Sequence, residues 1–176
     1  RMLNSAFNEL TGNTDDYYPE PLREEIEAVN NRVYNTINNG VYKAGFATTQ
    51  EAYNEAYTAL FDSLDWLEAR LAKQRYLVGD VITEADWRLF TTLIRFDAVY
   101  HGHFKCNLKR IIDYPNLYGY MCDLYYHDNV AETVDFDHIK RHYYMTHPEV
   151  NPTRIVPVGP SFEFDALHNR ERLSNK

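Results

Sequence analysis

The chain has few of the residues that mark disulfide-rich, membrane-spanning or nucleic-acid-binding proteins. Its two cysteines, Cys106 and Cys122, are too few for a disulfide scaffold, which favours a reducing, cytoplasmic location. No apolar run approaches the roughly 20 residues that span a bilayer, and the first residues lack the basic-then-apolar order of a signal peptide. The formal net charge is -8, whereas a protein that binds along phosphates needs clustered lysine and arginine. We therefore expect neither a membrane nor a nucleic acid among the partners.

What the sequence does contain is helical periodicity, in 176 residues that suit one domain. Pro21 suits the first turn of an amphipathic helix, and Gly40 suits its end. Thr48 and Glu51 form a capping box that predicts the start of a second helix. The apolar faces comprise Leu22, Ile26, Val29, Val33 and Ile37 in the first helix, and Ala52, Tyr53, Ala56, Tyr57, Leu60, Phe61, Leu64, Leu67 and Leu71 in the second.

The rest of the chain continues the helical pattern. Helices are expected near residues 115–126, 130–133 and 136–144, followed by an extended, proline-punctuated tail over 155–176. Because neither strand alternation nor an internal repeat occurs, we predict an all-α helical bundle. The first residues are also apolar at helical spacing without an N-cap, so we expect a helix that continues from upstream residues. These residues are Met2, Leu3, Ala6, Phe7 and Leu10.

The stretch GDVITEADWRLF specifies a helix start in several ways. Thr83 and Asp86 form a capping box, and Ile82 and Trp87 are placed for a hydrophobic staple. The helix that follows is apolar on nearly all sides, which predicts a place in the middle of a bundle. A buried cap satisfies end amides that would otherwise cost about 1–3 kcal/mol each. The apolar residues are Ala85, Trp87, Leu89, Phe90, Leu93, Ile94 and Phe96.

Candidates for metal binding or nucleophilic catalysis are weak. The loop over residues 101–106 holds His101, His103 and Cys106, but three donors without a spaced partner set are little evidence for zinc, and we expect no metal. His138 and His142 lie four apart without the glutamate of a His-Glu-x-x-His site. Neither Cys106 nor Cys122 follows a helix start that would lower a thiol pKa.

The 15 tyrosines are more informative. Most tyrosines in such a chain fill the wet edge of a helical core. Tyr42, between Gly40 and Gly45, and Tyr143, in the stretch KRHYYMTH, are placed where loops could direct phenols toward a ligand.

The run GDVITEAD over residues 79–86 resembles the capping signature that opens the central helix in the C-terminal domain of glutathione transferases. Further segments resemble the glutathionyl-hydroquinone reductases, the Xi class of that superfamily, in order along nearly the whole chain. These segments are NNGVYKAGFATTQEAY, RYLVGDVITEAD, RLFTTLIRFDAVYHGHFKCN, DYPNLYGYMCDLY, VDFDHIKRHYY and NPTRIVPVGP.

The resemblance implies that this chain is the helical half of a two-domain enzyme. In the family, a thioredoxin-like domain precedes this region and carries a Cys-Pro-Trp-Ala motif with the nucleophilic cysteine, together with a Glu-Ser pair that holds glutathione. None of these motifs is present here, so we expect the nucleophile outside this chain. The implied substrates are glutathione and a glutathionyl-hydroquinone. Tyr42 and Tyr143 are then the phenol donors to the ring oxygens, with His142 as a weaker candidate.

Two other interpretations remain open from the sequence. The chain could be a non-catalytic binding or assembly domain of the glutathione-transferase type, or part of a conventional glutathione transferase with an upstream serine or tyrosine. A Cys-Pro-Trp motif upstream would separate them. The family resemblance also implies a homodimer, with the tail NPTRIVPVGP bracing the pocket or the interface.

Overall fold

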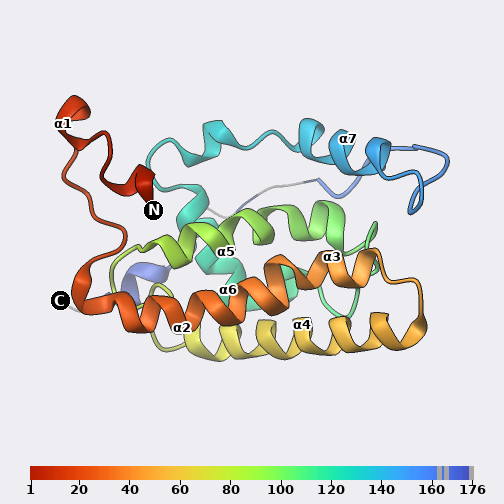
Figure 1. Cartoon of the computed structure of the whole chain (residues 1–176), viewed down its shortest axis with the longest axis horizontal. Helices are drawn as coiled ribbons and strands as arrows, with labels where there is room; N and C mark the ends of the chain where they lie inside the picture. Colours follow the sequence, from red (N-terminus) through yellow and green to blue (C-terminus); the bar gives the residue numbers. More distant parts are fainter. Residues whose placement is uncertain (162–163, 165–166, 175–176) are drawn as a thin grey trace.

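The chain folds as a bundle of α-helices joined by short helical turns (Figure 1). The computed structural model of the chain describes residues 1–161, 164 and 167–174. No strand occurs in these residues, and the prediction of an all-α fold is confirmed. None of the described helices is long and apolar enough to cross a membrane. The α-helices are α1 (Asn8–Thr11), α2 (Arg23–Val33), α3 (Gly40–Gly45), α4 (Gln50–Leu71), α5 (Glu84–Arg95), α6 (Pro115–Tyr125) and α7 (Phe136–Thr146).

Shorter helical turns connect these elements. Two are π-helical: η3 (Tyr34–Asn38) joins α2 to α3, and η4 (Phe96–Tyr100) continues α5. The 3-10 turns are η1 (Met2–Asn4), η2 (Glu20–Leu22), η5 (Ile111–Asp113), η6 (Val130–Thr133) and η7 (Arg170–Leu173).

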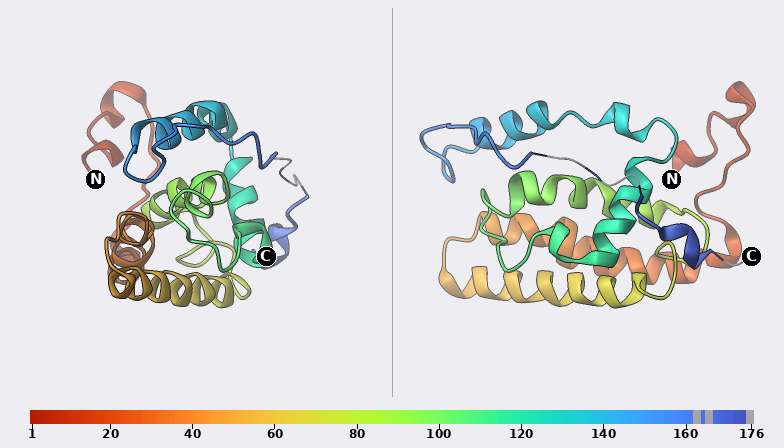
Figure 2. Two further views of the ribbon diagram at one scale, coloured as in Figure 1. Left: turned by 90° about the vertical axis from the view of Figure 1, so that its right-hand side faces the viewer. Right: turned by 180° about the vertical axis from the view of Figure 1, so that it is seen from behind.

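Helix α5 lies in the middle of the bundle. Seen end-on in Figure 2, it is surrounded by α2, α4, α6 and α7. It packs against α2 and α6, while α7 packs on η4, the continuation of α5. The apolar pattern after residue 83 therefore predicted the position of this helix correctly. Its buried residues are Ala85, Asp86, Leu89, Phe90, Thr92, Leu93 and Ile94.

Thr83 and Asp86 form a capping box at the start of α5. The Asp86 carboxylate accepts the Thr83 backbone N–H at 2.7 Å and the Thr83 hydroxyl at 3.0 Å. It also accepts the N–H of Leu77 at 2.9 Å and the hydroxyl of Tyr120, on α6, at 2.8 Å. Burial raises the pKa of the Asp86 carboxyl, and these four hydrogen bonds act in the opposite direction. One buried carboxylate thus joins the turn before α5, the start of α5 and α6.

Two predicted helix ends are wrong. Gly40 does not end its helix, because Asn39 keeps a right-handed helical conformation (φ -83°, ψ -26°) and the chain passes through η3 into α3. The N-cap of α4 is Thr49 rather than Thr48, since the Thr49 hydroxyl accepts the N–H of Ala52 at 3.2 Å. With Thr49 as N-cap, the third helical residue is Ala52 rather than Glu51, so the expected capping box with Glu51 does not form.

The first residues form two short turns, η1 and α1, instead of one helix. Ser5, with φ -140°, leaves the helical conformation after η1, and Gly12, with φ 71°, ends α1 in the left-handed region that glycine adopts readily. The side chains of Met2, Phe7 and Leu10 are exposed.

The tail is not extended throughout. Residues 155–161 carry no helix, but η7 forms a helical turn, while residues 162–163, 165–166 and 175–176 lie outside the described part. Arg170 is only 2% exposed, and its guanidinium donates to the carbonyl oxygens of Leu71, Gln74 and Arg75. The Leu71 carbonyl lies at the carboxyl end of α4, where a cation is favoured, and those of Gln74 and Arg75 lie in the turn that follows. The tail therefore caps a helix that lies far upstream in sequence.

Candidate functional site

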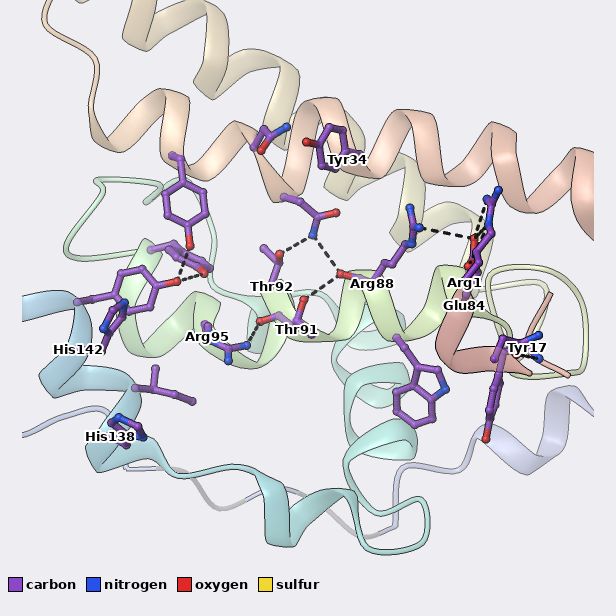
Figure 3. Close-up of a pocket in the computed structure, with 18 residues that line it drawn as sticks. Arg1, Tyr17, Tyr34, Glu84, Arg88, Thr91, Thr92, Arg95, His138 and His142 are labelled. Atoms are coloured by element: carbon purple, nitrogen blue, oxygen red, sulfur yellow. Dashed lines mark hydrogen bonds and ion pairs between the residues drawn. The ribbon is translucent and has the colours of Figure 1, made fainter. Parts of the chain in front are cut away.

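A cleft of about 1240 Å³ runs between α5 on one side and α7 on the other, with η3 and α3 along its edge (Figure 3). Its walls mix phenols, amides and cations with a few apolar side chains. The residues that line it include Tyr34, Asn38 and Tyr42, then Trp87, Arg88, Thr92, Arg95 and Tyr100, and finally His138, Ile139, His142 and Tyr143.

Three tyrosine hydroxyls meet at one end of this cleft. The hydroxyl of Tyr143, on α7, lies 2.6 Å from that of Tyr42, on α3, and 2.8 Å from that of Tyr100, on η4. Tyr100 and Tyr143 are buried, with 2% and 6% of their surface exposed, whereas Tyr42 is 38% exposed. The cluster therefore presents its Tyr42 side to the cleft and keeps Tyr100 away from water.

The positions of the protons follow from this burial. Tyr100 is enclosed and has the Tyr143 hydroxyl as its hydrogen-bond partner, so it donates to Tyr143, because a buried O–H without an acceptor is costly. Burial raises the pKa of Tyr143 to about 12, and the hydrogen bond from Tyr100 opposes that rise. Burial also raises the pKa of Tyr100. Both phenols are protonated at neutral pH. Two hydrogen bonds among three hydroxyls leave one proton for a ligand, and a ligand that replaces the Tyr42–Tyr143 hydrogen bond can accept from both of these hydroxyls.

A close backbone approach holds Tyr42 in place. A Cβ atom on Gly45, at the end of α3, would lie 2.2 Å from ring atoms of Phe104, so only glycine lets α3 come this close. The Phe104 ring lies 5.5 Å from the ring of Tyr42 and 5.6 Å from that of Tyr100. Phe104 is therefore the apolar support on which two of the three phenols rest.

The base of the cleft is held by hydrogen bonds between η3 and α5. The Asn38 amide donates to the Thr92 hydroxyl at 2.6 Å and to the Arg88 carbonyl oxygen at 3.1 Å. Since Tyr42 lies one turn beyond Asn38, these bonds fix the spacing between the phenol and α5.

The cations along the cleft differ in their partners. Arg1 and Arg88 both form ion pairs with the Glu84 carboxylate. The Arg95 guanidinium donates to the backbone carbonyl of Thr91, and none of the ion pairs found among the described residues involves it. Its charge nevertheless acts on the tyrosine cluster, because it lowers the pKa of Tyr143 against the dominant effect of burial.

Neither cysteine is placed for nucleophilic chemistry. Cys106 and Cys122 are both buried, and neither forms a disulfide within the described residues. Burial raises the pKa of Cys106 to about 12, so it carries no thiolate at neutral pH.

The suspected metal donors of residues 101–106 do not gather around a common point. His103 instead lies with its Nε2 at 3.2 Å from Nδ1 of His147. Within the described chain, the donors close enough to share an ion are Asp123, His168 and Glu171, and Arg75 hydrogen-bonds both oxygens of Asp123.

Comparison of the sequence with known proteins shows which family the chain is similar to. The family model for the glutathione S-transferase C-terminal domain matches residues 50–121. The chain is 61% identical over 161 residues to the glutathionyl-hydroquinone reductase PcpF of Sphingobium chlorophenolicum, covering 92% of this chain and 51% of that protein. It is 53% identical over 171 residues to the glutathionyl-hydroquinone reductase YqjG of Escherichia coli K12, covering 97% and 52%. The chain corresponds to the C-terminal domain portion of the glutathionyl-hydroquinone reductases, the Xi class of glutathione transferases.

Solved structures of this family have the same fold. The glutathione-bound structure of YqjG matches with a TM-score of 0.94 over 97% of this chain and 56% of that one. A Xi class glutathione transferase from Natrialba magadii, 51% identical, matches with a TM-score of 0.95 over 98% of this chain and 53% of that one. The chain spans about half the length of the curated relatives that it matches.

The residues selected from the sequence fall in two places. Tyr42, Tyr143 and His142 all line the cleft, although Tyr42 lies on helix α3 rather than in a loop. Thr83 and Asp86 lie in the interior at the start of α5. The sequence analysis missed Tyr100, which completes the tyrosine cluster, because it follows an apolar run and has no feature that separates it from a core aromatic.

Proposed function

We propose that this chain is the helical, substrate-binding half of a glutathione-dependent reductase that converts glutathionyl-hydroquinones to hydroquinones and releases glutathione disulfide. It would act together with a preceding thioredoxin-like domain that supplies the nucleophilic cysteine. The observation that carries the proposal is the pair of hydroxyls of Tyr42 and Tyr143, 2.6 Å apart at the end of the cleft, in a member of this family. The inert state of Cys106 supports a nucleophile outside the chain.

The chemistry needs hydrogen-bond donors of this kind. A thiolate attacks the thioether sulfur of the substrate, a sulfur–sulfur bond forms, and the carbon–sulfur bond breaks with its electron pair left on the ring. That negative charge spreads onto the ring oxygens, and a proton then converts the ring to hydroquinone. A second glutathione cleaves the mixed disulfide, which gives glutathione disulfide and regenerates the thiolate. Fixed donors at the ring oxygens stabilise the charged transition state.

Each residue of the cluster has its own role in this proposal. Tyr42 and Tyr143 donate to the ring oxygens, and His142, whose ring packs edge-on against Tyr143 with 5.1 Å between centroids, assists from α7. Tyr100 does not contact the substrate. It is a positioning residue that donates to Tyr143 and thereby turns the Tyr143 proton toward the cleft.

The same proposal includes a cytoplasmic homodimer that binds glutathione. Two cysteines that form no disulfide within the described residues favour a reducing compartment. The tail braces α7, since Lys140 donates to the carbonyl oxygens of Pro157 and Val158, and it leaves the side chains of Ile155 and Val158 exposed for a second copy. Light scattering at micromolar concentration tests whether the protein is a dimer. If a Val158→Asp variant is as dimeric as its parent, the tail is not part of the interface.

The catalytic proposal is tested in the protein that carries both domains. Tyr42→Phe and Tyr143→Phe should each lower kcat for a glutathionyl-hydroquinone by about ten- to a hundredfold, because each loses one of two donors. Tyr34→Phe is the matched control, since Tyr34 lines the same cleft outside the cluster. Reduction of a small disulfide without a ring should survive all three changes. Parallel loss of both activities, or no loss of either, would contradict the role of the two phenols.

A further inference from the structure

The cleft contains a positive charge that neither the fold nor the tyrosine chemistry accounts for. The polar side chains of α5 that line the cleft follow one face of the helix, from Glu84 through Arg88 to Arg95. Arg88 forms an ion pair with Glu84, at 3.8 Å, and Glu84 also pairs with Arg1 at 3.0 Å. Arg95 takes part in none of the ion pairs found in the described chain, and its guanidinium donates to a neutral group, the carbonyl oxygen of Thr91. Because Arg95 makes no ion pair within the described chain, its charge can meet an anion in the cleft.

The opposite wall supports the same interpretation. His138 and His142 lie one turn apart on α7, and they line the same cleft as Arg95, whose guanidinium bends back to the Thr91 carbonyl on α5 (Figure 3). Both imidazoles are exposed, and each offers a ring N–H donor. Asp135 also lines the space beside Arg95 and His138, and its carboxylate caps α7 by accepting the N–H of His138 at 2.9 Å. None of the ion pairs found among the described residues joins Asp135 to Arg95, so the guanidinium and the two imidazoles remain available to a ligand anion.

A second cavity, of about 390 Å³, opens at this point. It lies between α5 and residues 130–139 and shares Trp87, Arg95 and His138 with the main cleft. Arg95 therefore lies where the main cleft and the second cavity meet. It lines the same cleft as Tyr42 and Tyr143, so a substituent on a ring bound at the tyrosine cluster could extend toward it.

We propose that Arg95, with His138 and His142, forms a subsite for a carboxylate carried by the hydroquinone ring, so that the cleft prefers acidic hydroquinones to neutral ones of the same shape. The placement of the ring rests on the function proposed above. A planar guanidinium binds a carboxylate through two parallel hydrogen bonds, and partial exclusion of water in the cleft strengthens them. A carboxylate of glutathione is the other source of the same chemistry, and the test separates the two.

The test is equilibrium binding, because it does not depend on turnover. Trp87 lines the cleft, so its fluorescence reports on ligands bound there to the protein with both domains. The probes are 2,5-dihydroxybenzoate and its methyl ester, which share both hydroxyls and differ in charge. The parent should bind the acid about tenfold more tightly than the ester, the lower end for a hydrogen bond to a charged group. This preference for the acid should decline as salt is added, and the parent protein alone is enough for that measurement.

Variants then assign the preference to one side chain. Arg95→Gln should bring the two dissociation constants to within about twofold of each other, Arg95→Lys should retain part of the preference, and Arg88→Gln, the matched control, should retain it fully. Equal affinities in the parent, or a preference that persists in Arg95→Gln, would overturn the proposal. So would weaker glutathione binding in Arg95→Gln with the preference intact, since that would assign the carboxylate to glutathione. Failure to turn over any glutathionyl-hydroquinone would refute the proposed function and leave the binding ratios as an independent result.

Discussion

Replacing Asp86 by alanine should destabilise the protein far more than removing an ordinary helix cap. The carboxylate accepts four hydrogen bonds and is 0% exposed, so Asp86→Ala leaves the N–H groups of Leu77 and Thr83 and the hydroxyl of Tyr120 without acceptors in the interior. The Thr83 hydroxyl loses the same acceptor. No water replaces the lost oxygen atoms unless the core opens.

The magnitude follows from the donors left behind. An unsatisfied buried donor costs about 1–3 kcal/mol, and the two backbone amides have no freedom to turn elsewhere, so they account for about 4 kcal/mol. The raised pKa of Asp86 shows that burying its charge is itself unfavourable, and removal of the charge offsets part of this loss. We expect a net loss of about 3 kcal/mol. Thr83→Ala removes only one of the four donors and should cost about 1 kcal/mol.

Urea denaturation followed by circular dichroism measures both changes, provided that the slope against denaturant stays the same. Asp113 is a matched control, because its carboxylate caps η5 through the N–H of Arg110 at 2.8 Å in the same way but on the surface. Asp113→Ala should cost less than about 1 kcal/mol. Equal losses for the Asp86 and Asp113 variants would refute the reasoning, since burial would then have no effect on the cost of a lost cap.

Three further predictions concern other parts of the bundle. Gly45→Ala should cost about 1–3 kcal/mol in thermal or urea unfolding, because its Cβ would overlap the Phe104 ring, whereas Gly40→Ala meets only an ordinary contact and should be tolerated. Burial lowers the pKa of His103 to about 4, so the folded state favours the neutral ring; stability is full above about pH 6.5 and declines by up to about 3 kcal/mol as the pH falls to 4. His103→Gln should flatten this decline, and an unchanged profile would assign it to other groups. The isolated chain should catalyse no glutathione-dependent thiol transfer, and activity that Cys106→Ser abolishes would contradict the proposed location of the nucleophile.

Local chemistry predicts some helix boundaries of this chain well and others poorly. Pro115 begins α6 as expected, because a proline at a first helical turn needs no hydrogen-bond partner for its nitrogen. The helix end predicted at Gly40 is wrong, since glycine typically ends a helix where the chain turns left-handed, and here Asn39 stays helical. Nothing in the flanking sequence reports whether a π turn will continue the helix.

The site is predictable only in part, for a similar reason. Tyr42 and Tyr143 were selected from short motifs, but their contact joins residues 101 positions apart and depends on how α3 and α7 pack. Tyr100 looked like a core aromatic, and it is one, apart from a hydroxyl that meets Tyr143. The unpaired charge of Arg95 is equally invisible in the sequence, because an arginine on a helix surface usually faces water.

The capping of α4 by Arg170 has a consequence for synthesis of the protein. Arg170 donates to the carbonyl of Leu71, 99 residues earlier in the chain. At about 5–20 residues per second, a ribosome needs on the order of 5–20 s to make the intervening segment. During that time the carboxyl end of α4 has no permanent partner for its carbonyl groups and is exposed to chaperones and proteases. Nascent chains stalled before residue 170 should therefore be cleaved near residues 71–75, and chains in which the η7 turn has left the exit tunnel should resist cleavage there.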